Sequence, residues 1–229
     1  MINTQANSEY YAELRMPMLS LVRGVPQRVL EIGCAGGQTL NYLKQRGSQY
    51  TIGIECSPPA ASVARDRGVD QIVIGDIENL ETPFEPASFD LIVVGHVLEH
   101  LTDPWAVLRK LAIFLKEDGQ LVGAIPNVRH HSVLLPLLLF GKWQYQPSGL
   151  LDWTHLRFFC RTSIVNLLES TGFQVEKIVP DFGRKSRLAN SLSLTLLQDF
   201  LCFAYNFSAR LATRTGRDFR PQEAARLTA

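Results

Sequence analysis

An almost unbroken run of apolar residues, from Phe89 to Gly95, constrains the fold of this 229-residue chain more than any other feature. A strand that is covered by helices on both faces is apolar along its whole length, whereas a strand with one wet face alternates apolar and polar residues. We therefore predict that Phe89–Gly95 is a central strand of a parallel sheet that lies between two layers of helices.

The segments on either side of this run alternate between strand-like and helix-like patterns. Further strands are predicted at Arg28–Ile32, Tyr50–Glu55, Gln71–Gly75, Gln120–Ile125 and Phe173–Val179. Helices are predicted over Gly37–Arg46, after the cap at Ser57-Pro58-Pro59, between Asp103-Pro104 and Gly119, and over Thr162–Thr171. Such alternation is typical of an α/β fold: a doubly wound, mostly parallel sheet with helices on both faces.

The alternation is clearest between residues 25 and 180, which we predict to be the main domain, preceded by an N-terminal helical segment at 1–24. It weakens after Pro126, and we expect residues 126–160 to form helices and loops over the active site, hereafter the cover segment. An apolar helical extension is expected at 181–213, where a helix over Leu192–Phe207 would place Leu196, Phe200, Phe203 and Phe207 on one side. Residues 214–229 are expected to be disordered.

Composition narrows the class of partner. A net charge of +1 argues against a nucleic-acid partner held by a broad basic surface. The four cysteines stand far apart without a Cys-x-x-Cys pair, so neither structural zinc nor a disulfide scaffold is indicated. The N-terminus is polar and lacks the order of a signal peptide, and we expect a cytoplasmic protein.

A glycine-rich turn, Gly33-Cys34-Ala35-Gly36-Gly37-Gln38, follows the first strand. In the dinucleotide fingerprint Gly-x-Gly-x-x-Gly, glycines would stand at the positions of Ala35 and Gln38. Glu31, near the end of the strand, would repel a pyrophosphate but suits a ligand that carries an ammonium and a sulfonium. The turn therefore favours S-adenosylmethionine over a dinucleotide.

Two more acidic residues follow the next two strands. Glu55 is placed to accept hydrogen bonds from two ribose hydroxyls, which is a feature of NAD sites as well as S-adenosylmethionine sites. Asp76 could accept from an adenine amino group, and the backbone N–H of Ile77 could reach a ring nitrogen. Because parallel strands end at one edge of the sheet, Glu31, Glu55 and Asp76 are predicted to line one crevice.

Several motifs together resemble the class I S-adenosylmethionine-dependent methyltransferases, over about residues 25–180. They are Val29-Leu-Glu-Ile-Gly-Cys-Ala-Gly-Gly37, Gly53-Ile-Glu-Cys56, Gly75-Asp-Ile77, Phe89-Asp-Leu-Ile-Val-Val-Gly-His-Val-Leu-Glu-His-Leu101 and Leu115-Lys-Glu-Asp-Gly-Gln-Leu121. The resemblance implies a Rossmann-like fold. It also implies which residues hold each part of S-adenosylmethionine. Its methionine end is expected to bind Glu31 and the turn residues Gly33, Cys34, Ala35 and Gly36. Its ribose is expected to bind Glu55, with Cys56 beside it, and its adenine to bind Asp76 and Ile77. Ala35 departs from the glycine that many members have there.

The segment after Ile125 is similar to a subgroup that methylates sugars, surface polysaccharides or secondary metabolites, with a more distant similarity to methionine-biosynthesis protein W. We therefore expect methyl transfer, by in-line displacement, to a hydroxyl, amine or carboxylate of a small-molecule, sugar or lipid-linked acceptor. The alternatives are an NAD-dependent oxidoreductase, which Glu31, Ala35 and Gln38 disfavour, and a cofactor-binding regulatory protein without turnover.

Candidate catalytic residues are His96, Asp152 and His155, because an oxygen or nitrogen nucleophile needs a base near neutral pH. His96 is expected to face the methyl donor, and Asp152 to orient His155 or to bind an acceptor hydroxyl. The alternative for Asp152 and His155 is that they belong to a polar network that attaches the cover segment to the sheet. His96-Val-Leu-Glu-His100 matches a zinc-peptidase pattern but begins at the end of a buried strand, so no metal is expected.

Two apolar runs, 134–140 and 192–207, are more apolar than loops usually are. Neither is long enough to span a bilayer. They are expected either to pack against the domain or a second copy in a homodimer, or to contact a membrane surface or a lipid-linked substrate.

Overall fold

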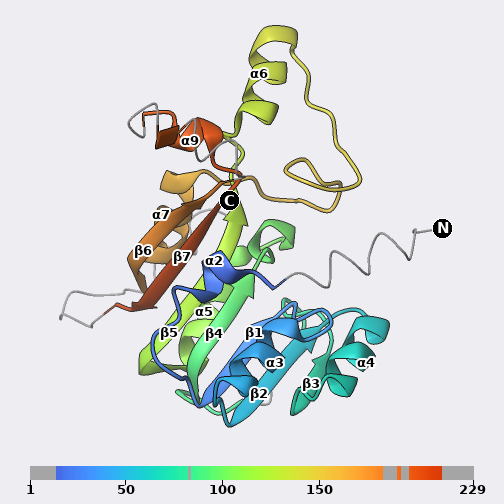
Figure 1. The fold of residues 1–229 in the computed structure, drawn as a ribbon, viewed down its shortest axis with the longest axis vertical. Coiled ribbons are helices and arrows are strands. Elements are labelled where there is room, and N and C mark those ends of the chain that lie inside the picture. Colours follow the sequence, from blue (N-terminus) through green and yellow to red (C-terminus); the bar gives the residue numbers. More distant parts are fainter. Residues whose placement is uncertain (1–13, 82–83, 183–189, 192–195, 213–229) are drawn as a thin grey trace, which may run out of the picture.

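The structure is a computed structural model that describes residues 14–81, 84–182, 190–191 and 196–212, and within these residues seven strands form one sheet (Figure 1). The strand order is β3-β2-β1-β4-β5-β7-β6, in which β7 runs antiparallel to its two neighbours and the other pairs are parallel. The strands are β1 (Arg28–Ile32), β2 (Tyr50–Glu55), β3 (Gln71–Ile74), β4 (Phe89–Gly95), β5 (Leu115–Pro126), β6 (Phe173–Asp181) and β7 (Ala204–Leu211). The doubly wound, mostly parallel sheet is confirmed.

The described residues also form helices. They are α2 (Met16–Leu19), α3 (Gln38–Gln45), α4 (Pro58–Asp66), the short 3₁₀ helix η1 (Leu98–His100), α5 (Pro104–Phe114), α6 (His131–Phe140), α7 (Arg161–Ser170) and α9 (Gln198–Leu201). Alternate residues of the central strand face opposite layers: Leu91 and Val93 pack with residues of α2, α3 and α4, and Ile92 and Val94 with residues of α5 and α7. The prediction that β4 is buried on both faces is confirmed.

Side chains cap the first turns of α4 and α5, where the sequence predicted helices to begin. The Ser57 hydroxyl accepts a hydrogen bond from the Ala60 N–H, and the Asp103 carboxylate accepts one from the Ala106 N–H at 2.9 Å. The end predicted for α5 at Gly119 is wrong, because α5 stops at Phe114 and Gly119 lies within β5.

The helix predicted over Leu192–Phe207 is also wrong where the structure describes it. Residues 192–195 lie outside the described residues, α9 is a single turn, and Ala204–Phe207 belongs to β7. Tyr205 and Phe207 are fully buried on one face of the sheet. The period of two in these side chains is a strand signal. The tail 214–229 and the first thirteen residues also lie outside the described part of the chain.

The cover segment leaves the sheet at the end of β5 and returns to α7. Figure 1 shows α6 standing away from the sheet, with a long loop running back from it. A bridge between Asn127 and Phe159 joins the two ends of the segment. The helical and loop cover expected after the fifth strand is therefore present. Among the described helices, none is long and apolar enough to cross a membrane.

Candidate active site

The Glu31 carboxylate, at the end of β1, is buried without a full set of partners. Its residue is 6% exposed, and Oε2 has no hydrogen-bond partner among the described residues. Burial raises the pKa of Glu31 to about 8, against the opposing effects of a hydrogen bond with Thr39 and the charge of Arg15. A buried acceptor of this kind is stabilised by a cationic ligand, and the ammonium group of S-adenosylmethionine fits it.

The glycine turn brings its backbone close to the end of β2. The Gly33 N–H donates to the Ile54 carbonyl oxygen at 2.8 Å, with φ of +65°, and a β-carbon there would lie 2.8 Å from the Val97 side chain. Gly37, with φ of +75°, is the residue directly before α3, and a β-carbon on it would meet Val69 and the Ala64 backbone. Both positions require glycine, because side chains rarely adopt this conformation and no space is available.

The side chain of Cys34 lies behind the turn. Cys34 is buried, and a β-carbon on Gly53 would overlap its sulfur. The Arg67 guanidinium donates to the Gly36 carbonyl oxygen. Ala35 lies in the left-handed region with φ of +47°, so the alanine that stands here in place of glycine carries backbone strain.

Glu55 connects this turn to the start of α4. Its Oε2 accepts from the Ala35 N–H and its Oε1 from the Ser57 N–H, each at 2.8 Å. Each carboxylate oxygen can accept a second hydrogen bond. Glu55 is thus held rigidly at the place where the ribose hydroxyls were predicted to bind.

Asp76 follows β3 and accepts hydrogen bonds from the Glu78 N–H at 3.0 Å and from the Asn79 amide at 2.7 Å. The Ile77 side chain is buried, and its carbonyl oxygen accepts from the Lys110 ammonium at 3.1 Å. The Cys56 thiol donates to the Gly75 carbonyl oxygen at 3.4 Å. These bonds fix the edge of β3, and the adenine contact of Asp76 and Ile77 stays a prediction.

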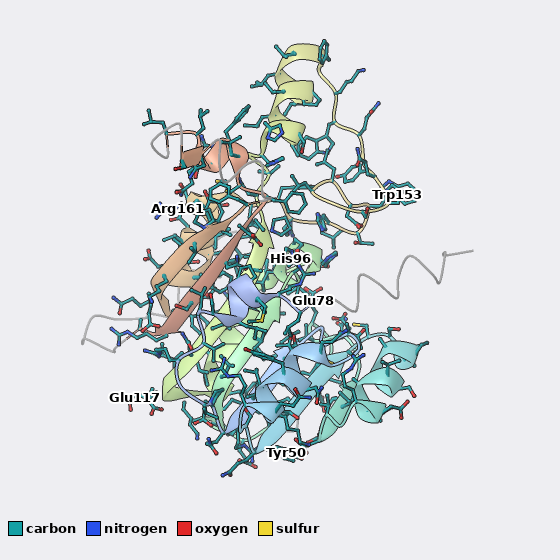
Figure 2. All side chains as sticks on the ribbon, in the orientation of Figure 1. Tyr50, Glu78, His96, Glu117, Trp153 and Arg161 are labelled. Atoms are coloured by element: carbon teal, nitrogen blue, oxygen red, sulfur yellow. The ribbon has the colours of Figure 1, made fainter. Side chains whose placement is uncertain are left out.

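His96, which is labelled in Figure 2, stands directly after β4. Glu31 and Glu55 lie at the corresponding ends of the neighbouring parallel strands β1 and β2. The His96 backbone has φ of +56°, a conformation that residues other than glycine seldom adopt. Its ring Nδ1 lies 3.2 Å from Oε1 of Glu99, whose residue is 1% exposed. A strained backbone and a buried carboxylate thus hold the imidazole in one orientation.

The cover segment meets His100 of η1 through Thr154 and His155, and the Asp152 and His155 side chains do not pair as predicted. The Asp152 carboxylate accepts from the Thr154 N–H and hydroxyl, at 2.8 and 2.7 Å. The His155 ring is buried and bonds instead to the Leu150 carbonyl oxygen at 3.1 Å. Asp152 therefore shapes the loop, and the prediction that it orients His155 is wrong in this structure.

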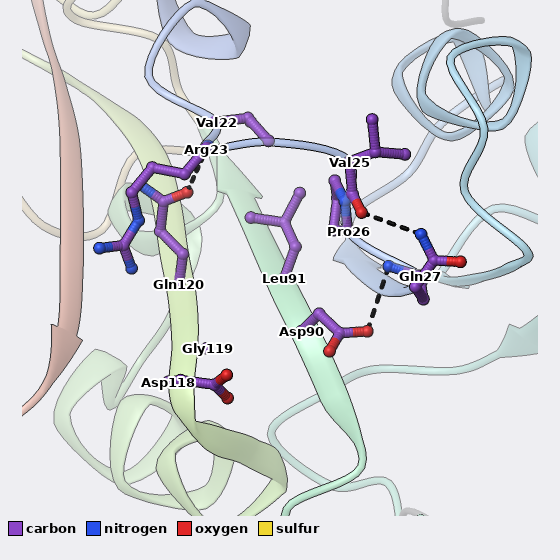
Figure 3. A pocket seen from close by; sticks show the side chains of 10 residues that line it. All are labelled: Val22, Arg23, Val25, Pro26, Gln27, Asp90, Leu91, Asp118, Gly119 and Gln120. Atoms are coloured by element: carbon purple, nitrogen blue, oxygen red, sulfur yellow. Dashed lines mark hydrogen bonds between the residues drawn. The ribbon is translucent and has the colours of Figure 1, made fainter.

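A separate hollow of about 250 Å³ lies at the amino ends of β1 and β4 (Figure 3). Asp90 and Gln120 line it, and both are hydrogen-bonded within the protein: Asp90 accepts from the Gln27 N–H, and Gln120 accepts from the Arg23 N–H. This edge is opposite to the carboxyl ends of the strands, where Glu31, Glu55 and His96 gather, so it adds nothing to the candidate active site.

His96 was singled out from the sequence as a candidate catalytic residue, but Glu99 was given no role in the site. Glu99 binds His96 through its side chain, and its carbonyl oxygen accepts from the Leu156 and Arg157 N–H groups of the cover segment. The spacing of three residues between His96 and Glu99 was the signal, but it does not show that the carboxylate is buried.

A family model described as a methyltransferase domain matches residues 4–178 of this chain. The chain belongs to that family. The predicted class, an S-adenosylmethionine-dependent methyltransferase, is thereby confirmed together with its cofactor, and the NAD-dependent alternative is set aside.

Relatives and solved structures agree with this assignment. The chain is similar to a ubiquinone biosynthesis O-methyltransferase from Neisseria meningitidis, 26% identical over 160 residues, and to one from Xanthomonas campestris, 34% identical over 161 residues. Each match covers 65% of this chain, and the chain spans about two thirds of each relative, 64% and 66%.

Two solved structures share the fold at low identity. The S-adenosylmethionine-dependent methyltransferase from Mesorhizobium loti superposes with a TM-score of 0.63 at 18% identity, over 85% of this chain and 96% of the other. The one from Archaeoglobus fulgidus has a TM-score of 0.64 at 22% identity, over 89% and 93%.

Proposed function

We propose that this methyltransferase methylates a hydroxyl oxygen of a small-molecule acceptor. The observation that carries the proposal is the pairing of His96 with the buried Glu99 carboxylate at the end of β4. A hydroxyl must lose its proton as it is methylated, and an imidazole oriented by a carboxylate is suited to take it. The curated relatives, named O-methyltransferases, support the same class of acceptor.

The proposed cofactor contacts follow the strand ends. Glu31 binds the ammonium group, the backbone of the glycine turn approaches the methionine part, Glu55 binds the ribose and Asp76 the adenine. Bound S-adenosylmethionine supplies a methyl carbon that is already activated by its sulfonium. The chain therefore has to align the acceptor oxygen and keep water away from it.

The proposed base is Nε2 of His96. Glu99 accepts the Nδ1 proton, which leaves the lone pair of Nε2 free to take the acceptor's proton. His155 is buried in the polar contact between cover segment and η1, so we assign the base to His96 rather than to His155.

The cover segment favours an acceptor that carries an apolar chain. Leu138, Leu139 and Phe140 on α6 are largely exposed, with Leu138 at 75%. Exposed apolar surface on a helix that stands away from the sheet is typical of a site for an apolar ligand or a lipid surface. This feature supports a lipid-linked acceptor over a free sugar.

An acceptor panel tests the proposal. A phenol, an aniline and a benzoic acid with matched ring substituents are incubated with the enzyme, and S-adenosylhomocysteine is measured. We expect the wild type to turn over the phenol. His96→Gln should slow this turnover by about 100-fold or more, while its cofactor binding, measured by calorimetry, should be unchanged. His131→Gln, a histidine on α6, serves as the control. Faster turnover of the aniline, or an active His96→Gln enzyme, would contradict the proposal.

A further inference from the structure

Three potential metal ligands meet where the cover segment contacts the end of β4. Glu99, His100 and His155 each offer a ligand atom, and these atoms lie within 4.8 Å of one another. Glu99 and His100 come from η1, and His155 comes from the cover segment. The rings of His100 and His155 have their centroids 4.8 Å apart at an interplanar angle of 71°.

Both histidines are held in the form that binds a metal. Nδ1 of His155 lies 3.1 Å from the Leu150 carbonyl oxygen, and Nδ1 of His100 lies 3.1 Å from the Thr154 carbonyl oxygen. A carbonyl oxygen only accepts, and the Thr154 hydroxyl, 3.0 Å from Nδ1 of His100, donates its own proton to the Asp152 carboxylate. Each Nδ1 therefore carries the proton, and each Nε2 has a free lone pair. Metal-binding histidines usually donate their second ring N–H to a carbonyl or carboxylate in this way.

The Glu99 carboxylate supplies a second, independent indication. Its residue is 1% exposed, and Oε2 has no hydrogen-bond partner within the described residues, while Oε1 lies 3.2 Å from His96. A buried carboxylate oxygen without a partner is costly, because burial removes the water that would solvate it. A cation between Glu99 and the two imidazoles would remove that cost.

We propose that Glu99, His100 and His155 form a binding site for a divalent transition metal of the zinc class. Two nitrogen ligands and one carboxylate suit zinc, whereas magnesium prefers oxygen ligands in an octahedral arrangement. Ligand atoms around tetrahedral zinc lie about 3.4 Å apart, so each side chain has to shift by roughly 1 Å or less.

The site joins two parts of the chain that are distant in sequence. The metal attaches the cover segment to η1, next to the proposed base His96. The Leu156 and Arg157 N–H groups already donate to the Glu99 carbonyl oxygen, so the backbone on both sides of the site is fixed. Three protein ligands leave one position open for a water molecule or another oxygen ligand.

Metal titration tests this inference without any acceptor. The full chain is stripped with a chelator, and Zn²⁺ is titrated against a chromophoric competitor, with Co²⁺ absorption as a report on the ligand geometry. We expect one equivalent of Zn²⁺ per chain, with Mg²⁺ unable to compete at equal concentration. Glu99→Gln, His100→Gln and His155→Gln should each weaken Zn²⁺ binding by about 100-fold or more. His131→Gln, a partly buried histidine outside the site, should bind as the wild type does.

Thermal unfolding gives a second measurement. Zn²⁺ should raise the Tm of the wild type and of His131→Gln but not that of His155→Gln, because a ligand that binds only the folded state stabilises it. Binding of S-adenosylhomocysteine checks that each variant is folded, and it is independent of the acceptor chemistry. The inference would be overturned if the wild type took up no stoichiometric Zn²⁺. It would also be overturned if the folded variants His155→Gln and Glu99→Gln took up as much Zn²⁺ as the wild type.

Discussion

The Glu31→Gln substitution should make the free energy of unfolding less dependent on pH. Burial raises the pKa of Glu31 from 4.5 to about 8. Between these two values the folded protein keeps a proton that the unfolded chain has released. The contribution of Glu31 to stability is therefore complete below pH 4.5 and is lost as the pH rises to 8.

The size of the effect follows from the pKa difference. A pKa shift of one unit corresponds to about 1.4 kcal/mol of unfolding free energy. The full difference between the unfolded and folded pKa values of Glu31 therefore corresponds to roughly 5 kcal/mol. Between pH 5 and 8 the stability of Glu31→Gln relative to the wild type should rise by about 1.4 kcal/mol per pH unit, because glutamine has no proton to release.

Urea unfolding at several pH values between 5 and 8, followed by tryptophan fluorescence, measures this difference. Asp70→Asn is the control. Hydrogen bonds from Lys44 and Thr51 lower the pKa of Asp70 despite its partial burial, so its titration lies below this window. Parallel stability curves for the wild type and Glu31→Gln would refute the reasoning.

Three further predictions concern the cofactor turn and the cover segment. Glu55→Gln should weaken S-adenosylmethionine binding by about tenfold or more in calorimetry, because one carboxylate oxygen that accepts from Ala35 or Ser57 is replaced by an amide N–H₂ donor. Gly37→Ala should lower the free energy of unfolding by at least about 1–3 kcal/mol; Gly141→Ala, also at positive φ but in open space, should cost less in the same urea titration. Leu138→Ser should change the free energy of unfolding by no more than about 0.5 kcal/mol relative to the wild type. The same variant should slow the turnover of a phenol that carries an alkyl chain more than the turnover of the same phenol without the chain.

The first five strands and their succession along the chain could be predicted because each strand carries its own local signal. The apolar run of β4, the turn after β1 and the caps at Ser57 and Asp103 depend on neighbours in sequence. β7 was missed because its partners are remote: it inserts between β5 and β6, and the apolar residues before it suggested a helical period. Local pattern reasoning fails where sheet pairing at long range determines the structure.

The difference between local and long-range signals also explains why one of the two buried carboxylates of the site could be predicted from sequence and the other could not. Glu31 could be assigned from sequence, because its position before the glycine turn places it at the end of β1 whatever the rest of the chain does. Glu99 could not, since its environment depends on the cover segment folding back to place His155 beside it. In both residues one carboxylate oxygen is buried without a partner among the described residues. Such an oxygen is costly unless a cation binds it, so both indicate where a ligand belongs: an ammonium group at Glu31 and, by our inference, a metal ion at Glu99.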